Sequence, residues 1–302
     1  MTSYSSSNKN YNKILHETVT KNYKKRMIVN KLVTAFTIVC VIAAIIPLGS
    51  ILIEVVKNGA SAISFEFLTQ PQGSIGSGSG GVGPAIQGTI IVVGLASLIA
   101  APVGVLAGIY LSEFAKQGVF ADSVRFFNDV LTGLPSIVIG IVGYVIIVLS
   151  IGSFSVFAGA VSLSIIMIPI VVRVTEETLK IVPFSLREAG HSLGISKARI
   201  TLSIVLPSAK NGILTGIVLG ISRIAGETAP LIMTILGTSL FFTGITGPVD
   251  ALPLRIWRLA SQPYESAHAF GWGSALVLIL MILAMSVGLR FLAQRSSFKA
   301  AS

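Results

Sequence analysis

Charged residues are scarce in this chain. Of its 302 residues, only 11% are Asp, Glu, Lys or Arg, whereas 53% are hydrophobic and the mean hydropathy is +0.85. Soluble domains carry about 25% charged residues, so the composition excludes an ordinary globular enzyme, a disordered protein and a fibrous protein. The class that remains is an integral membrane protein.

The residues that build most metal and nucleophile sites are also rare. One cysteine, Cys40, excludes an intramolecular disulfide and a cysteine metal cluster. The motifs H-E-x-x-H and G-x-S-x-G do not occur, and the three histidines lie far apart in the sequence, at His16, His191 and His268. We therefore expect a chain that is not an enzyme and that binds no metal or cofactor of its own.

A glycine-rich stretch, Gly73–Pro84, contains the pattern G-x-G-x-x-G. A dinucleotide site needs that pattern after a strand in a soluble domain, and a Walker A loop needs a Lys-Ser/Thr pair, which this stretch lacks. We interpret it as a flexible linker. The chain is then expected to have no site for hydrolysing ATP.

Six long apolar runs dominate the sequence. A helix crosses the hydrocarbon layer of a bilayer in roughly 20 apolar residues, and its backbone must be hydrogen-bonded internally. The sequence therefore predicts an all-α protein with six transmembrane helices, over about Leu32–Ile53, Ala85–Leu111, Val130–Ile151, Phe154–Val172, Gly212–Leu236 and Ser274–Leu292. Prolines inside these runs predict kinks or breaks, at Pro47, Pro102, Pro135 and Pro169.

The basic residues gather on one side of these spans. Seven Lys or Arg precede the first span, two lie in Ser112–Asp129, six in Arg173–Lys210 and three after the last span, whereas the opposite side has Lys57, Arg255 and Arg258. Because loops rich in Lys and Arg stay in the cytoplasm, we expect both termini to be cytoplasmic. Attraction to anionic membrane lipid then explains the net charge of +10 without nucleic acid as a partner.

These spans predict four segments and no separate soluble domain. Residues 1–31 form a basic cytoplasmic tail, which we expect to be loose apart from a short amphipathic helix near Ile14–Val19. Residues 32–84 contain the first transmembrane helix and a glycine-rich outer loop. Residues 85–292 form the main transmembrane domain with five helices, and residues 293–302 form a cytoplasmic C-terminal tail.

The cytoplasmic connection Pro183–Pro207 is the most informative segment between two spans. Ser185 followed by Glu188 fits a capping box, which predicts the start of a short helix. Gly194 suits a left-handed helix end. We expect a second short helix from about Ser196, broken by the final proline of the segment.

Ala189 and Gly190 should keep part of this segment's surface flat, so that another chain can approach closely. The segment resembles the coupling loop of ABC-importer permeases, whose pattern is Glu-Ala-Ala, three residues, Gly, nine residues, and Ile-x-Leu-Pro. Gly190 replaces the second alanine of that pattern, and six residues fall on it in register: Glu188, Ala189, Gly194, Ile204, Leu206 and Pro207. The resemblance implies a loop that docks on a separate ATPase subunit. The alternative is a helical hairpin that only links two spans.

Three other stretches look like the A-type member of the permease pair of phosphate importers: Pro84–Phe114, Gly133–Ile141 and Arg223–Ile232. This resemblance implies a type I ABC importer permease in the inner or plasma membrane of a bacterium or archaeon. It also implies phosphate as substrate and three kinds of partner, which are a phosphate-binding protein outside, a second related permease, and an ATPase dimer that binds ATP and magnesium. A permease for sulfate or molybdate and a proton-coupled secondary transporter are the alternatives.

Arg223 and Glu227 lie near the middle of the predicted fifth span. Each charge at a bilayer centre costs roughly 2.5–3.5 kcal/mol on translocon scales. Four residues apart on one helix, the two can pair, and they share a face with Gly212, Gly216 and Gly220. One interpretation is a structural ion pair inside a helix bundle. We favour a substrate path in which Arg223 meets the phosphate oxyanion and Glu227 prevents it from being trapped.

The outer segment Ala251–Gln262 predicts a short interfacial helix with Trp257 at headgroup level. Arg255 and Arg258 on this helix could attract an anion or help to dock the binding protein. Interface anchors whose charged ends reach water are the alternative interpretation of both arginines.

Overall fold

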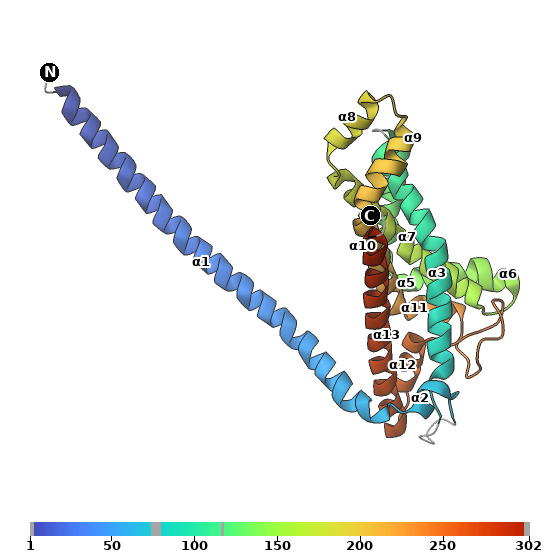
Figure 1. The fold of residues 1–302 in the computed structure, drawn as a ribbon. Coiled ribbons are helices and arrows are strands. Elements are labelled where there is room, and N and C mark those ends of the chain that lie inside the picture. Colours follow the sequence, from blue (N-terminus) through green and yellow to red (C-terminus); the bar gives the residue numbers. More distant parts are fainter. Residues whose placement is uncertain (1–2, 74–79, 116–117, 299–302) are drawn as a thin grey trace. The chain divides into compact units, whose positions relative to one another are not determined.

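The computed structural model describes residues 3–73, 80–115 and 118–298 of the chain (Figure 1). Within these ranges the regular structure is helical, and the only β-type pairings are two isolated bridges, Gln72–Gly80 and Leu236–Val249. The predicted all-α fold is confirmed. The chain separates into two compact units, Met1–Val56 and Lys57–Ser302, which are described separately below. Residues 76 and 78 of the glycine-rich linker lie outside the described residues.

The first unit consists of most of helix α1, Ser3–Gly59. This helix includes the predicted span Leu32–Ile53, and its apolar part is long enough to cross a membrane. The prediction of a loose tail was wrong, because residues 3–31 contain neither glycine nor proline and nothing in them ends a helix. The segment Ile14–Val19 is part of the same continuous helix.

Long helices form the frame of the second unit, with shorter helices at their ends. Three stretches have the wider π-helical winding: η2 (Tyr110–Phe114), η3 (Tyr144–Val148) and η4 (Thr201–Val205). The long helices are α3 (Gly83–Ile109), α7 (Val156–Ile181), α10 (Leu206–Ala225) and α13 (Glu265–Phe298). The shorter ones are η1 (Ala60–Ala62), α2 (Phe65–Thr69), α4 (Val119–Gly133), α5 (Ser136–Gly143), α6 (Leu149–Ile151), α8 (Phe184–Ser192), α9 (Lys197–Ile200), α11 (Ala229–Thr234) and α12 (Leu252–Ala260).

Among the described residues, five helices are long and apolar enough to cross a membrane, and there are six such spans if a bent pair of helices counts as one. The bent pair joins α4 to α5–α6 at an angle of 103°. The predicted third span, Val130–Ile151, therefore had the wrong start, since its first residues belong to α4. The break falls at Leu134 and Pro135, because a proline disfavours the helical conformation of the residue before it.

Close helix contacts at glycines hold α3 against α7. A Cβ at Gly104 would lie 2.7 Å from Val171 Cβ, and one at Gly108 would lie 2.6 Å from Thr175 Cβ. Both distances are too short for any side chain larger than hydrogen, so the two glycines, four residues apart, let the helices meet at close range. On α7, Leu163 and Val171 are fully buried in this contact layer, where close van der Waals packing, rather than the removal of apolar surface from water, stabilises the contact between two membrane spans.

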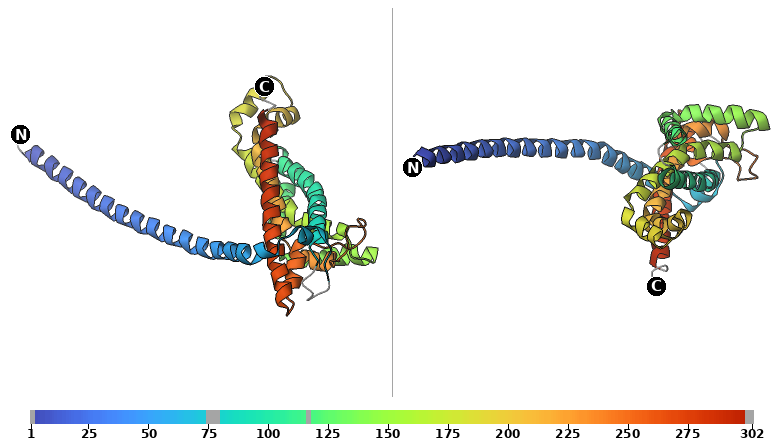
Figure 2. Two further views of the ribbon diagram at one scale, coloured as in Figure 1. Left: turned by 60° about the horizontal axis from the view of Figure 1, so that its bottom comes forward. Right: turned by 90° about the horizontal axis from the view of Figure 1, so that it is seen from above.

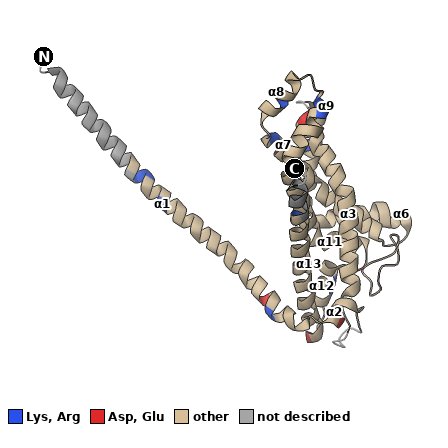
Figure 3. Cartoon of the chain, viewed as in Figure 1, with Lys and Arg blue, Asp and Glu red and all other residues tan. Residues whose placement is uncertain are grey.

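The second unit has two distinct ends. We call α8, α9 and the residues between them, 193–196, the knob. The knob lies at the same end as the C-terminal part of α13, whereas α2 and α12 lie toward the opposite end (Figures 1 and 2). Lys and Arg gather near the knob, and α3 and α13 carry few charges along their length (Figure 3). The knob is thus at the end that the charge pattern assigns to the cytoplasm.

Candidate functional site

The first short helix that the sequence predicted in the knob is present as α8, but it begins differently. Its N-cap is Pro183 without a side-chain hydrogen bond, so Ser185 lies inside the first turn and the predicted capping box with Glu188 was wrong. The Leu186 N–H donates to the Pro183 carbonyl at 3.2 Å, which closes the first turn two residues earlier than a cap at Ser185 would. Gly194 does have the predicted left-handed conformation, with φ of +73°, a conformation that costs glycine little because it has no Cβ.

Gly190 serves the internal packing of the knob. It is buried, and a Cβ there would lie 2.8 Å from Ile200 Cγ1 on α9. The prediction that Gly190 flattens the outer surface was therefore wrong, since this residue faces α9. Glu188 and Ala189 are exposed, so they are the residues of the Glu-Ala-Ala register that a partner can reach.

The last residues of the coupling-loop pattern, Ile204, Leu206 and Pro207, connect the knob to the spans. The helix runs from Lys197 through η4 into α10 without the predicted break, because Pro207 falls in the first turn of α10, directly after the π-helical stretch. Ile204 and Leu206 pack against a buried apolar cluster made of Leu179, Val182, Ile200, Val205, Ala209 and Ile213. These pattern residues hold α9 and α10 onto the end of α7.

Arg187, which the sequence analysis missed, fixes α8 to the spans. Its guanidinium donates to Glu113 at 2.6 Å and 3.2 Å, to the Val182 carbonyl at 2.7 Å and to the Leu179 carbonyl at 2.9 Å. The side chains of Arg187 and Glu113 are only 15% and 5% exposed. The sequence did contain a signal for this contact, because Glu113 is the only charged residue in a long apolar span, and a buried carboxylate needs a partner.

A second ionic cluster ties α4 to α7. The Arg125 Nε–H donates to Glu176 Oε1 at 3.0 Å, and the Lys180 ammonium donates to the same oxygen at 2.7 Å. A cavity of about 170 Å³ lies beside them and is also lined by Asp129 and Glu177. Since three acidic and three basic side chains line this cavity, it has no excess positive charge with which to bind an anion.

Arg223 and Glu227 do not lie in one continuous span. Helix α10 ends at Ala225, and α11 begins at Ala229. The prediction of a single span over 212–236 was wrong, because Gly226 at the helix end and Pro230 in the first turn of α11 both favour a break. Arg223 thus lies in the last turn of α10 and Glu227 in the non-helical link.

Across this break, Arg223 and Glu227 form an ion pair, in which Arg223 Nη1–H donates to Glu227 Oε1. The pair is asymmetric, since the Glu227 side chain is only 7% exposed whereas that of Arg223 is 56% exposed. The buried carboxylate therefore accepts from one nitrogen of the guanidinium, while more than half of the Arg223 side chain is exposed in the isolated chain. Such a group can bind an oxyanion through its remaining N–H donors.

Gly212, Gly216 and Gly220, which were predicted to share a helix face with this pair, have another role. A Cβ at Gly212 would lie 2.2 Å from Thr178 Cγ2, and one at Gly216 would lie 2.7 Å from Val174 Cγ1. These glycine positions pack α10 against α7 inside the chain. They shape the helix contact and do not line an open path.

The predicted outer helix is present as α12, but one of its arginines is buried. Arg255 is 2% exposed, and its Nε–H donates to Asp250 Oδ2 at 2.6 Å. The interpretation of Arg255 as an anchor that reaches water was wrong. Arg258 donates to the Leu236 carbonyl, and Trp257 is half exposed. The position of Trp257 at the headgroup level stays a prediction. Burial raises the pKa of the Asp250 carboxyl above its ordinary value, although the Arg255 guanidinium opposes this shift.

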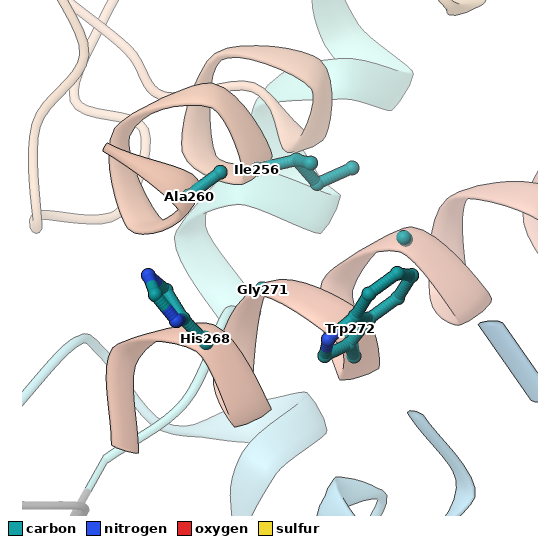
Figure 4. A pocket seen from close by; sticks show the side chains of 6 residues that line it. Ile256, Ala260, His268, Gly271 and Trp272 are labelled. Carbon is teal, nitrogen blue, oxygen red and sulfur yellow. The ribbon is translucent and has the colours of Figure 1, made fainter. Parts of the chain in front are cut away.

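An apolar cavity of about 350 Å³ lies between α12 and the start of α13 (Figure 4). Its lining includes Ile256, Gly271 and Trp272, with His268 as the titratable side chain (Figure 4). One ring nitrogen of His268 is already hydrogen-bonded to the Gln262 carbonyl at 2.7 Å. This cavity lacks the donors that phosphate needs. In the described part of the chain, no group of three or more His, Cys, Asp or Glu is placed to hold a metal ion.

Comparison with protein families gives a match over residues 100–298, to the family described as "Binding-protein-dependent transport system inner membrane component". Curated relatives are phosphate transport system permease proteins PstA. The protein from Yersinia pestis is 39% identical over 237 residues, which are 78% of this chain and 80% of that protein. The protein from Haemophilus influenzae is 37% identical over 88% of this chain and 94% of its own length. One from Methanocaldococcus jannaschii, named as probable, is 36% identical over 92% and 96%.

Solved structures with a similar fold are also ABC transporters. A bacterial alginate transporter in complex with its alginate-bound periplasmic protein matches with a TM-score of 0.64 and 16% identity, over 90% of this chain and 97% of that chain. An inward-facing MetNI methionine transporter matches with a TM-score of 0.57 and 14% identity, over 71% and 96%. At such low identity these structures establish the fold alone.

Proposed function

This chain belongs to the binding-protein-dependent inner membrane components, and among them to the phosphate transport permeases, and we propose that it is the permease subunit of an ATP-driven importer of inorganic phosphate. The chain is then a non-catalytic subunit that forms half of the path through the membrane. Permeases for sulfate or molybdate are disfavoured, because the curated relatives from bacteria and an archaeon are named for phosphate.

The observation that carries the substrate path is the asymmetry of the pair formed by Arg223 and Glu227. A guanidinium that is 56% exposed in the isolated chain would be costly against lipid. The break between α10 and α11 would be costly there too, since non-helical backbone at membrane depth is tolerated only where it is buried in protein or lines a water-filled cavity. We therefore place Arg223 on the path between this chain and a second, related permease.

The chemistry of this site suits transient binding of phosphate. Phosphate at neutral pH carries between one and two negative charges, and a guanidinium offers it several N–H donors in one plane. A bare cation would hold the anion too tightly for release. Glu227, buried beneath Arg223, keeps the empty site near neutral and so limits the affinity.

The knob is the proposed docking element for the ATPase subunits, which bind ATP and magnesium. The exposed residues Glu188 and Ala189 lie on α8, and the large apolar side chains of Phe184 and Leu193 are 69% and 79% exposed beside them. Solvent exposure of such side chains on a small helical projection favours a protein partner. An extracytoplasmic phosphate-binding protein would dock at the opposite end, where α12 lies.

Adding bulk at Ala189 tests this docking. In Ala189→Trp, we expect at least a tenfold loss of ATPase subunit that co-purifies with the permeases, because the new side chain points outward from α8. The thermal stability of the permeases should stay parental. Ala198→Trp adds the same bulk at an exposed position of α9, outside the Glu-Ala-Ala register, and should retain the ATPase. Equal retention by both variants would contradict docking through α8.

The energy source distinguishes this function from proton-coupled transport. In proteoliposomes that contain the assembled complex, with loaded phosphate-binding protein outside and ATP inside, labelled phosphate should accumulate in the lumen. Accumulation should stop when ATP is replaced by ADP and should continue when a protonophore removes the proton gradient. Uptake that follows the proton gradient in the absence of ATP would contradict the proposal.

The orientation in the membrane has partial support. The knob and the C-terminal part of α13 lie at one end of the second unit, so a cytoplasmic knob would place the C-terminal end in the cytoplasm as well. The cytoplasmic position of the N-terminus stays a prediction that rests on the charge count.

A further inference from the structure

The span formed by α3 and η2 carries a single charge, at the end next to the knob. In the continuous helical stretch Gly83–Phe114, which has 32 residues, Glu113 is the only Asp, Glu, Lys or Arg. It lies in the π-helical stretch η2 and is 5% exposed. A buried carboxylate needs a compensating partner, and here the partner comes from the knob.

That partner, Arg187, precedes Glu188 of the coupling pattern. Two of its N–H groups meet the two oxygens of Glu113, so the contact is a planar, two-point ion pair. The remaining donors reach the carbonyls of Leu179 and Val182, at the end of α7. One side chain on α8 therefore joins the ends of α3 and α7, and its fixed geometry leaves little freedom for α8 to move alone.

A second contact joins the same two regions. The ammonium group of Lys197, at the start of α9, lies 5.4 Å from the centre of the Phe114 ring. This distance is within the range of a cation–π interaction. Both helices of the knob thus contact η2, through neighbouring residues.

From η2, close-packed contacts continue to the substrate site. Gly108 and Gly104 set α3 against α7, and Gly220 sets α10 against Met167 of α7. Arg223 follows three residues after Gly220 on α10. Because these contacts leave no room for a side chain, a displacement at one end of the stack moves the neighbouring helix with it.

We propose that Glu113 and Arg187 are positioning residues for energy coupling, which transmit a movement of the docked knob to α3 and α7. The inference rests on the proposed function, since it assumes that the knob docks on an ATPase. In this proposal the ion pair is a mechanical link between α8 of the knob and the ends of α3 and α7. Without the link, ATP hydrolysis continues but no longer drives phosphate movement efficiently.

The test measures phosphate imported per ATP hydrolysed in proteoliposomes that contain the full complex and loaded binding protein. Glu113→Gln keeps the shape of the side chain and removes its charge. We expect this ratio to fall at least tenfold while the subunits still co-purify in parental proportions. Glu176→Gln is the matched control, because it makes the same change in the α4–α7 ion pair, at 10% exposure, and should keep the ratio within twofold.

Three results would be informative. A parental ratio in an assembled Glu113→Gln complex would overturn the link. If Glu113→Gln does not assemble, Arg187→Lys is the deciding variant, because lysine keeps the positive charge but loses the two-point contact. We expect Arg187→Lys to import at least threefold less phosphate per ATP hydrolysed than the parental complex. An unchanged ratio would again overturn the link. If the parental complex itself shows no ATP-driven phosphate uptake, the proposed function fails, independently of these variants.

Discussion

Phosphate uptake should fall to background in a variant that carries both Arg223→Leu and Glu227→Leu, although the complex still assembles. Removing both charges leaves neither one unpaired, so folding is expected to suffer little. The loss of uptake should reach roughly 100-fold or more, the loss typical of removing an anion-stabilising donor. The measurement is initial uptake of labelled phosphate, normalised to assembled complex, with the ATPase rate recorded in parallel.

The single variants separate the two roles of the pair. Arg223→Leu leaves the buried Glu227 carboxylate without a partner and should lower both assembly and uptake. Under a purely structural role, the double variant would regain the transport that this single variant lost. Ser222→Ala is the neighbouring control, since it removes only a 2.9 Å hydrogen bond to Ser286 on α13 and should transport at near the parental rate. A double variant that imports phosphate at near the parental rate would remove Arg223 and Glu227 from the site.

Long apolar runs made the long helices predictable. Helix α3 and the apolar part of α13 follow from composition alone, because a segment of this length without charges has to satisfy its backbone inside a helix. The coupling segment was recognisable from the register of its glycine and its Glu-Ala pair. Its first short helix and the left-handed Gly194 are present in the structure, whereas the second predicted helix continues into α10.

The breaks in helices were harder to predict. Pro47, Pro102 and Pro169 all lie inside continuous helices, whereas Pro135 lies at a sharp bend. The same residue type therefore gives different results, and the surrounding packing decides between them. The break at Gly226 was hidden because apolar residues continue on both sides of it and keep the hydropathy high.

The partners of buried charges could not be predicted from local spacing. Glu113 and Arg187 are separated by 74 positions, so nothing in either segment indicates the other. The pair formed by Arg223 and Glu227 was predictable from its spacing of four, yet one of its members lies outside the helix that suggested the spacing. The number of charges that require a partner follows from composition, whereas the choice of partner depends on the tertiary arrangement.

The buried ion pair between Asp250 and Arg255 should give the largest loss of stability in the outer part of the molecule. Both side chains are almost fully buried, at 0% and 2% exposure. Arg255→Met removes the guanidinium that is hydrogen-bonded to the Asp250 carboxylate and leaves only the weaker influence of Arg258. Breaking a buried pair of this kind costs about 3–5 kcal/mol. The thermal unfolding midpoint of the purified complex should therefore fall clearly, whereas Arg258→Met, at a more exposed position of α12, should lower it much less.

The pH dependence of Arg255→Met provides a sharper test of this assignment. Burial raises the pKa of Asp250, and Arg255 opposes the shift, so the variant should have a carboxyl whose pKa in the folded state lies further above its unfolded value. The folded state then binds more protons than the unfolded state, and stability falls as the pH rises through the folded pKa. We expect the Arg255→Met variant to lose more of its unfolding midpoint, relative to the parental complex, at pH 8 than at pH 5.

Adding Asp250→Leu to Arg255→Met should remove the pH dependence and recover most of the stability, because no unpaired charge remains buried. A single variant whose loss is equal at both values of pH, or a double variant less stable than Arg255→Met alone, would show that Asp250 is not the group left uncompensated.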